Sequence, residues 1–112
     1  MKLITAIIQP SALDTVRLEL AKAGVSGLTI SEAAGCARQK GHTEVYRGAE
    51  FTIDFLEKVR VEVLCTDEEF ENVVETICDA ARTGEIGDGK VWASEVQDVI
   101  RIRTRERGPA AI

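Results

Sequence analysis

Residues 58–82 read KVRVEVLCTDEEFENVVETICDAAR, and this stretch decides the fold class. In its first part, residues 59–65 place an apolar side chain at every second position, which is the period of a strand with one buried face. Residues 70–81 then place apolar side chains three and four apart, which is the period of an amphipathic helix. Between this strand and this helix, Thr66 and Glu69 have the spacing of a capping box. The stretch therefore predicts a strand followed directly by a helix.

The amino-terminal half repeats this plan. Ser11 is placed to cap a helix whose apolar stripe continues to Gly24. The other expected strands cover 2–9, about 28–35, 91–96 and 99–103. The order β-α-β, repeated once, predicts an α+β fold, a ferredoxin-like βαββαβ sandwich that forms a single domain over 1–112. Because aromatic residues are only 4% of the chain, the core is light, and we expect association to bury further apolar surface.

The composition narrows the range of functions that the chain can have. The net charge of -5 argues against a general nucleic-acid binder, which needs an excess of Lys and Arg to neutralise phosphates. The chain has three cysteines without close pairing, which are typical of reduced thiols in the cytosol. No apolar run approaches the length that crosses a bilayer. We expect a cytoplasmic protein without direct membrane insertion.

A long segment without sustained apolar periodicity, residues 36–55, separates the halves. Loops longer than about 12 to 15 residues are uncommon in compact domains and usually carry function. The alternative is a hairpin extension that only supports contacts in an oligomer.

The segment 84–90 reads GEIGDGK and has the spacing of a P-loop. A true P-loop follows a strand and opens a helix, with Ser or Thr after the Lys, whereas here a helix precedes, a strand follows and Val91 takes that position. A P-loop ATPase is therefore rejected. Closely spaced glycines with Lys90 still predict a phosphate cradle of another architecture, and a plain glycine-rich turn is the alternative.

Arginine recurs at every second position from Arg101 to Arg107. In an extended chain such side chains project to one side, and guanidinium groups bind phosphate oxygens in bidentate fashion. We expect ligand contact for Arg101 and Arg103, and a solvated tail for Arg105 and Arg107.

Catalysis has little support in the sequence. His42 and Cys36 lack partners at the short spacing of structural zinc sites, and no acid and base pair is evident. Trp92 fits a core or interface position better than a binding box. We expect a protein that is not an enzyme, with slow ATPase activity and RNA binding through the arginines as weaker alternatives.

Several segments closely resemble the PII signal-transduction family. They are 38–44 (RQKGHTE) with 46–50 (YRGAE), 80–84 (AARTG) with 87–92 (GDGKVW), 99–104 (VIRIRT) and the ending 111–112. In that family the first group belongs to the T-loop, here about 36–55, and the second to the B-loop, here about 82–90. A C-terminal segment of about 101–112 completes the likeness, which covers essentially the whole chain.

The resemblance implies a homotrimer that binds ATP or ADP in clefts between subunits. The residues matching the family's nucleotide site are Ile7, Thr29, Gly35, Arg38, Leu64, Thr83, Gly87, Asp88, Gly89, Lys90, Arg101 and Arg103. It also implies an effector, 2-oxoglutarate, that chelates the Mg of bound ATP. Gln39 would complete the metal coordination, Lys58 would pair with a carboxylate, and Lys40 and Gly41 would belong to the same pocket.

By the same likeness, the T-loop docks into target proteins such as an ammonium transporter or enzymes of nitrogen or carbon metabolism. The expected docking residues are Tyr46, Arg47, Gly48, Ala49, Glu50 and Phe51. Effector binding would select one T-loop conformation and thereby regulate nitrogen assimilation, which is allostery by population shift.

Two departures from the family bear on function. Many relatives carry a nucleotidylylated tyrosine at the position of Phe51, which has no hydroxyl, so no modification is expected there. Cys36 and Ala37 replace an aromatic residue and a glycine beside the effector pocket, and Ala adopts fewer backbone conformations than Gly. The alternative function is therefore a trimeric ferredoxin-like interaction module that binds nucleotide but has weakened 2-oxoglutarate sensing.

Overall fold

The computed structural model describes residues 1–36, 44–46, 49–51 and 55–112. Its elements along the chain are β1 (Lys2–Ile8), a 3-10 turn η1 (Pro10–Ala12), α1 (Leu13–Lys22), β2 (Thr29–Cys36), β3 (Glu44–Tyr46), β4 (Ala49–Phe51), β5 (Phe55–Cys65), α2 (Phe70–Ala81), β6 (Gly89–Glu95) and a 3-10 turn η2 (Gly108–Ala111). The α+β class and the order of the main elements are as predicted from the sequence.

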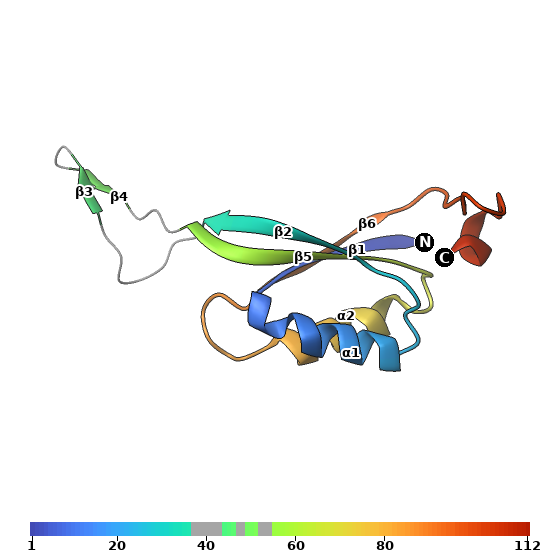
Figure 1. The fold of residues 1–112 in the computed structure, drawn as a ribbon, viewed down its shortest axis with the longest axis horizontal. Helices are drawn as coiled ribbons and strands as arrows, with labels where there is room; N and C mark the ends of the chain where they lie inside the picture. Colours follow the sequence, from blue (N-terminus) through green and yellow to red (C-terminus); the bar gives the residue numbers. More distant parts are fainter. Residues whose placement is uncertain (37–43, 47–48, 52–54) are drawn as a thin grey trace.

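Four strands form an antiparallel sheet in the order β2-β5-β1-β6 (Figure 1). Strand β1 lies between β5 and β6, with Ile4 opposite Val63 on one side and Ala93 on the other. Directly opposite residues share a face of the sheet. The alternation in 2–8 and 59–65 therefore places one set of aliphatic side chains together on a single face.

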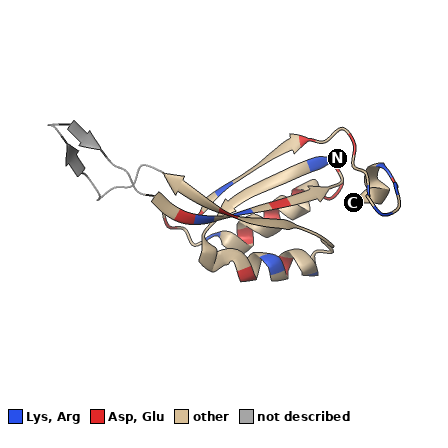
Figure 2. Ribbon diagram, turned by 45° about the horizontal axis from the view of Figure 1, so that its top comes forward, with Lys and Arg blue, Asp and Glu red and all other residues tan. Residues whose placement is uncertain are grey.

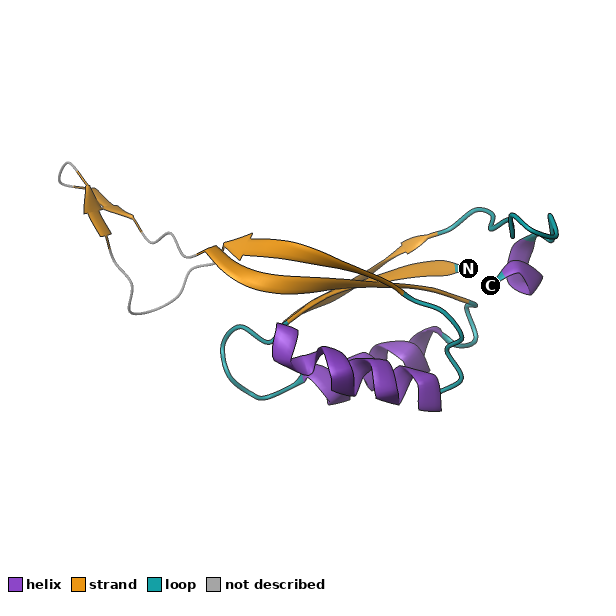
Figure 3. Cartoon of the chain, viewed as in Figure 1, coloured by secondary structure: helices purple, strands orange, loops and turns teal. Residues whose placement is uncertain are grey.

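Both helices cover that face, and the opposite face has no helix over it (Figure 3). The core between the layers consists of Ile4, Ala6, Ile8, Val16, Leu20, Val59, Val61, Val63, Cys65, Val73, Ile77 and Ala81. Each of these side chains is at most 9% exposed. On the uncovered face Trp92 remains 50% exposed and Leu64 remains 37% exposed, so apolar surface is left without a partner within the subunit.

The two helices begin differently from each other. At α2 the Glu69 amide donates to Thr66 Oγ1 at 3.3 Å, which confirms that half of the predicted capping box. The predicted Ser11 cap is wrong, because Pro10 opens a 3-10 turn and no side chain caps either η1 or α1. Proline fixes φ near the helical value, so it starts the turn without a capping hydroxyl.

The expected long loop contains a short hairpin. Strands β3 and β4 pair antiparallel, with Tyr46 opposite Ala49. This backbone pairing does not decide between a docking loop and the alternative of an extension for oligomer contacts.

The predicted β segment at 99–103 is wrong. Only an isolated bridge joins Ile100 to Arg107, and the chain between them turns back on itself. The Arg101 amide donates to Glu106 O at 2.9 Å, the Arg105 amide donates to Arg101 O at 2.7 Å, and Arg105 has a φ of 63°. Alternating Ile and Arg imitate a strand, but these local hydrogen bonds close a turn instead.

No helix in the described part of the chain is long and apolar enough to cross a membrane.

Candidate functional site

The B-loop connects the end of α2 to β6, and glycine backbone geometry shapes it. Gly84, Gly87 and Gly89 all have φ between 90° and 106°. At Gly89 a Cβ atom would lie 1.7 Å from the Ile7 carbonyl oxygen, because β6 begins in close contact with the end of β1. Only glycine fits there, and the amides on either side therefore take positions that a side chain would forbid.

The Asp88 carboxylate closes the B-loop from within. Its Oδ2 accepts from the Thr83 amide at 2.9 Å and from the Gly84 amide at 3.0 Å, and its Oδ1 accepts from the Thr83 hydroxyl. These hydrogen bonds, led by the one from the Thr83 side chain, lower the pKa of Asp88, and the nearby Arg82 charge acts in the same direction. Asp88 is therefore ionised at neutral pH and ties the two ends of the loop together.

Lys58 joins β5 to the B-loop. Its Nζ donates to Gly87 O at 2.6 Å, and its side chain lies against Gly35, where a Cβ atom would be 3.3 Å from Lys58 Cγ. The structure thus brings together residues that the sequence assigned to the nucleotide site, Gly35 and Gly87, and the residue that it assigned to the effector, Lys58.

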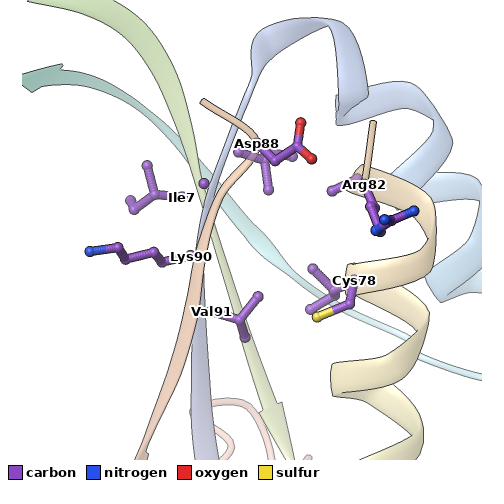
Figure 4. Close-up of a pocket in the computed structure, with 10 residues that line it drawn as sticks. Ile7, Cys78, Arg82, Asp88, Lys90 and Val91 are labelled. Carbon is purple, nitrogen blue, oxygen red and sulfur yellow. The ribbon is translucent and has the colours of Figure 1, made fainter. Parts of the chain in front are cut away.

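Ile7 and Lys90 project from the same side of the sheet. They are directly opposite in the β1–β6 ladder, and Arg60 lies opposite Ile7 on β5. In Figure 4 both labelled side chains lie on one side of β6, whereas Cys78 and Arg82 lie on the other. One end of the uncovered face therefore combines an aliphatic surface with the charges of Lys58, Arg60 and Lys90, which suits an apolar ring joined to phosphates.

The other predicted nucleotide residues in the described part of the chain lie at the opposite end of the sheet. Leu64 is opposite Leu3, four residues along β1 from Ile7, which is a separation of about 13 Å at the usual rise of a strand. A groove of about 750 Å³ is found there, and Thr29, Leu64 and Ile112 are among the residues that line it. A single subunit therefore does not unite the eleven predicted residues that the structure describes; it presents them as two separate groups.

Arg101 and Arg103 follow β6 at this second end, where the C-terminal segment carries several basic side chains (Figure 2). The Arg101 guanidinium pairs with Glu106 at 3.3 Å and donates to Ala110 O at 3.3 Å. Arg103 lies in the turn and is exposed. The predicted one-sided row of arginines is wrong because the turn at 101–105 is not extended.

Sequence reasoning missed one cavity. It lies behind the B-loop, between the last turn of α2 and β6, has a volume of about 220 Å³, and is lined by Ile77, Cys78 and Val91 among others (Figure 4). The apolar stripe of α2 could have indicated this cavity, but it was interpreted only as the buried face of the helix. In the described ranges no three His, Cys, Asp or Glu side chains are placed to hold a metal ion.

Several predicted residues cannot be placed. Arg38, Gln39, Lys40, Gly41, Arg47 and Gly48 lie outside the described residues, so the expected contact of Gln39 with Mg falls outside them too. For Tyr46, Ala49, Glu50 and Phe51 only the backbone pairing of the hairpin is described. The assignments of these residues stay predictions.

Comparison with known proteins decides the family. The family model for nitrogen regulatory protein P-II matches residues 1–106. The chain belongs to the PII family. Nitrogen regulatory proteins P-II from Rhizobium meliloti (strain 1021) and Azospirillum brasilense are 57% and 53% identical to it, each over the full length of both chains. The solved structure of B. subtilis GlnK superposes with a TM-score of 0.85 at 35% identity and covers 99% of this chain and 97% of that one.

Membership in the PII family agrees with the resemblance that first selected the two groups of residues. The resemblance found in the sequence is confirmed, and the chain is a signal protein of nitrogen regulation. The fold agrees with that of GlnK over nearly the whole length of the chain.

Proposed function

We propose that this PII protein is a homotrimeric sensor of the ferredoxin-like fold that binds ATP or ADP between subunits and 2-oxoglutarate with Mg, and controls target proteins through its T-loop. Its targets would be those of nitrogen or carbon assimilation, such as an ammonium transporter, in the cytoplasm. It would act by binding and not as an enzyme, with the whole of 1–112 as one domain.

The observation that carries this proposal is the division of the predicted nucleotide residues between two ends of one sheet. Gly87 and Lys90 lie at one end, next to the predicted effector residue Lys58, and Arg101 and Arg103 follow the strand at the other. A site that needs both groups forms only where the first end of one subunit meets the second end of another. Such a head-to-tail contact generates a ring when the rotation closes. The exposed Trp92 and Leu64 supply apolar surface for that ring.

A subunit-mixing experiment tests the division directly. Lys90→Ala and Arg103→Ala proteins are each expected to lose nucleotide binding as pure assemblies, because every cleft then lacks one phosphate contact. In assemblies reformed from an equal mixture, about one cleft in four joins an intact Lys90 to an intact Arg103. Calorimetry should then recover ATP and ADP binding at that fraction of sites.

The control variant is Arg105→Ala, which removes a predicted tail charge and should bind as the unaltered protein does. If the mixture recovers no binding although sedimentation shows that mixed assemblies formed, the sites are not shared between subunits. If the unaltered protein is a monomer, or ignores both ATP and ADP, the proposal fails altogether.

Weakened effector sensing is the second candidate. It rests on Cys36, which replaces the family's aromatic residue at the end of β2 and directly follows Gly35, the residue that lies against Lys58. Titration of 2-oxoglutarate into the protein with Mg and ATP distinguishes the two. Heat at micromolar effector supports the full sensor, whereas none at millimolar effector supports a nucleotide-binding module with weakened sensing.

A further inference from the structure

Asp88 is a negative charge in a loop proposed to hold phosphates. Two like charges a few ångströms apart repel each other, and the repulsion is stronger where water is partly excluded. A carboxylate in such a place therefore needs a role that outweighs this cost.

The hydrogen bonds of Asp88 indicate that role. Both carboxylate oxygens are occupied, by the Thr83 amide, the Thr83 hydroxyl and the Gly84 amide. Thr83 Oγ1 in turn accepts from the Glu85 amide at 3.1 Å, so the bonding continues into the tip of the loop. The negative charge is thus directed into the loop's own backbone.

The loop is also held from its other side. Gly87, the neighbour of Asp88, has its carbonyl fixed by Lys58 at 2.6 Å. Gly89, on the other side of Asp88, is fixed by its close contact with Ile7. The segment that carries the amides of Gly87 to Gly89 is therefore anchored at three points, and Asp88 supplies the anchor to the start of the loop.

We propose that Asp88 is a positioning residue: its carboxylate holds Thr83 and Gly84 and contacts neither phosphate nor Mg. This inference rests on the proposed nucleotide site and deepens it. It assigns phosphate recognition in this segment to backbone amides and Lys90. The carboxylate contributes by fixing the loop before the ligand arrives, so that binding does not have to order it.

Asp88→Asn is the first test, because Asn has nearly the same shape but carries no charge and offers one acceptor oxygen where the carboxylate offers two, so it cannot accept from both the amides and the Thr83 hydroxyl. Affinity for ATP and for ADP should fall by about tenfold or more, as expected for loss of charge-assisted hydrogen bonds. The fall should be equal with Mg and with EDTA. The matched control is Asp79→Asn. Asp79 is an exposed residue of α2 whose carboxylate makes no ion pair or hydrogen bond among the described residues, so this variant should bind nucleotide as the unaltered protein does.

Thr83 provides an independent variant and a rescue. Thr83→Val removes the hydroxyl that bonds to Asp88 and should weaken both nucleotides, whereas Thr83→Ser keeps the hydroxyl and should restore binding. A carboxylate that contacted the ligand directly would not require this hydroxyl. The double variant Asp88→Asn with Thr83→Val should lose little more than Asp88→Asn alone, because both changes break one unit.

Amide hydrogen exchange on the nucleotide-free protein separates this inference from the proposed function. The Thr83 and Gly84 amides should exchange slowly in the unaltered protein and at least tenfold faster in Asp88→Asn, with the amides of β1 unchanged. Equal exchange in both proteins overturns the positioning role even if nucleotide binds. An affinity loss seen only with Mg overturns it too, because it would identify Asp88 as a metal ligand.

Discussion

Gly89→Ala tests whether close contact between β1 and β6 shapes the backbone of the B-loop. The new Cβ would lie 1.7 Å from the Ile7 carbonyl oxygen, whereas carbon and oxygen atoms in contact between strands stay about 3.3 Å apart. The two strands would have to separate by roughly 1.6 Å at this point, which breaks the ladder hydrogen bonds nearest to the place where Gly89 faces Ile8. The change therefore disrupts one end of the ladder.

The cost of this change has two parts. Loss of two ladder hydrogen bonds destabilises by about 1 kcal/mol each. An alanine held at φ 106° adds about 1 to 2 kcal/mol of backbone strain. The sum of about 3 to 4 kcal/mol is a large part of the roughly 5 to 15 kcal/mol that stabilises a domain.

Urea unfolding at one fixed protein concentration measures the loss, since the stability of an assembly depends on concentration. The control is Gly27→Ala, where nothing lies within 4 Å of the added carbon and φ is not positive. That variant should unfold within about 0.5 kcal/mol of the unaltered protein. If Gly89→Ala is equally mild, the close contact does not constrain the loop and the reasoning about the B-loop backbone is refuted.

Three further predictions follow from single contacts. Lys58→Met keeps the aliphatic contact with Gly35 but leaves Gly87 O without its donor, so the free energy of unfolding should fall by about 1 kcal/mol in urea titrations. The N-terminal ammonium lies 3.2 Å from Asp67 and, through their hydrogen bond, lowers the pKa of that carboxyl. The pair therefore contributes to the stability of the folded protein above the unfolded pKa of about 4, and this contribution is lost as pH falls through the lower folded pKa. Asp67→Asn should therefore reduce the loss of thermal stability between pH 5 and about pH 3, and an unchanged pH profile would contradict this. Protein isolated from its host should carry no nucleotidyl group on Phe51, and a mass increment on the peptide that contains it would contradict the prediction.

The sheet and helices were predictable because burial on one face imposes a period on the sequence. Ile4 and Val61 alternate with polar or outward residues since the helices cover only one face. The start of α1 was not predictable in this way. Both Pro10 and Ser11 are permitted at helix starts, and the choice between them depends on the backbone path out of β1.

The B-loop was predictable in part. The closely spaced glycines were read correctly as positions of unusual backbone freedom, since Gly84, Gly87 and Gly89 have positive φ, whereas the anion cradle that they and Lys90 predict stays a prediction. The role of Asp88 was not accessible, because its bonds to Thr83 and Gly84 depend on a turn made by two glycines with positive φ. Periodicity predicts which face of a helix or strand a side chain occupies, but it does not predict side-chain contacts in an irregular loop.

The arrangement of the nucleotide residues was hidden by their closeness in sequence. Lys90 and Arg101 are only eleven residues apart, but β6 is straight between Lys90 and Glu95 and separates its ends by about 17 Å. Charges at opposite ends of a strand cannot share one phosphate chain within a subunit. A ligand that contacted both would have to join two subunits, so under the proposed function nucleotide binding and assembly of the ring should stabilise each other.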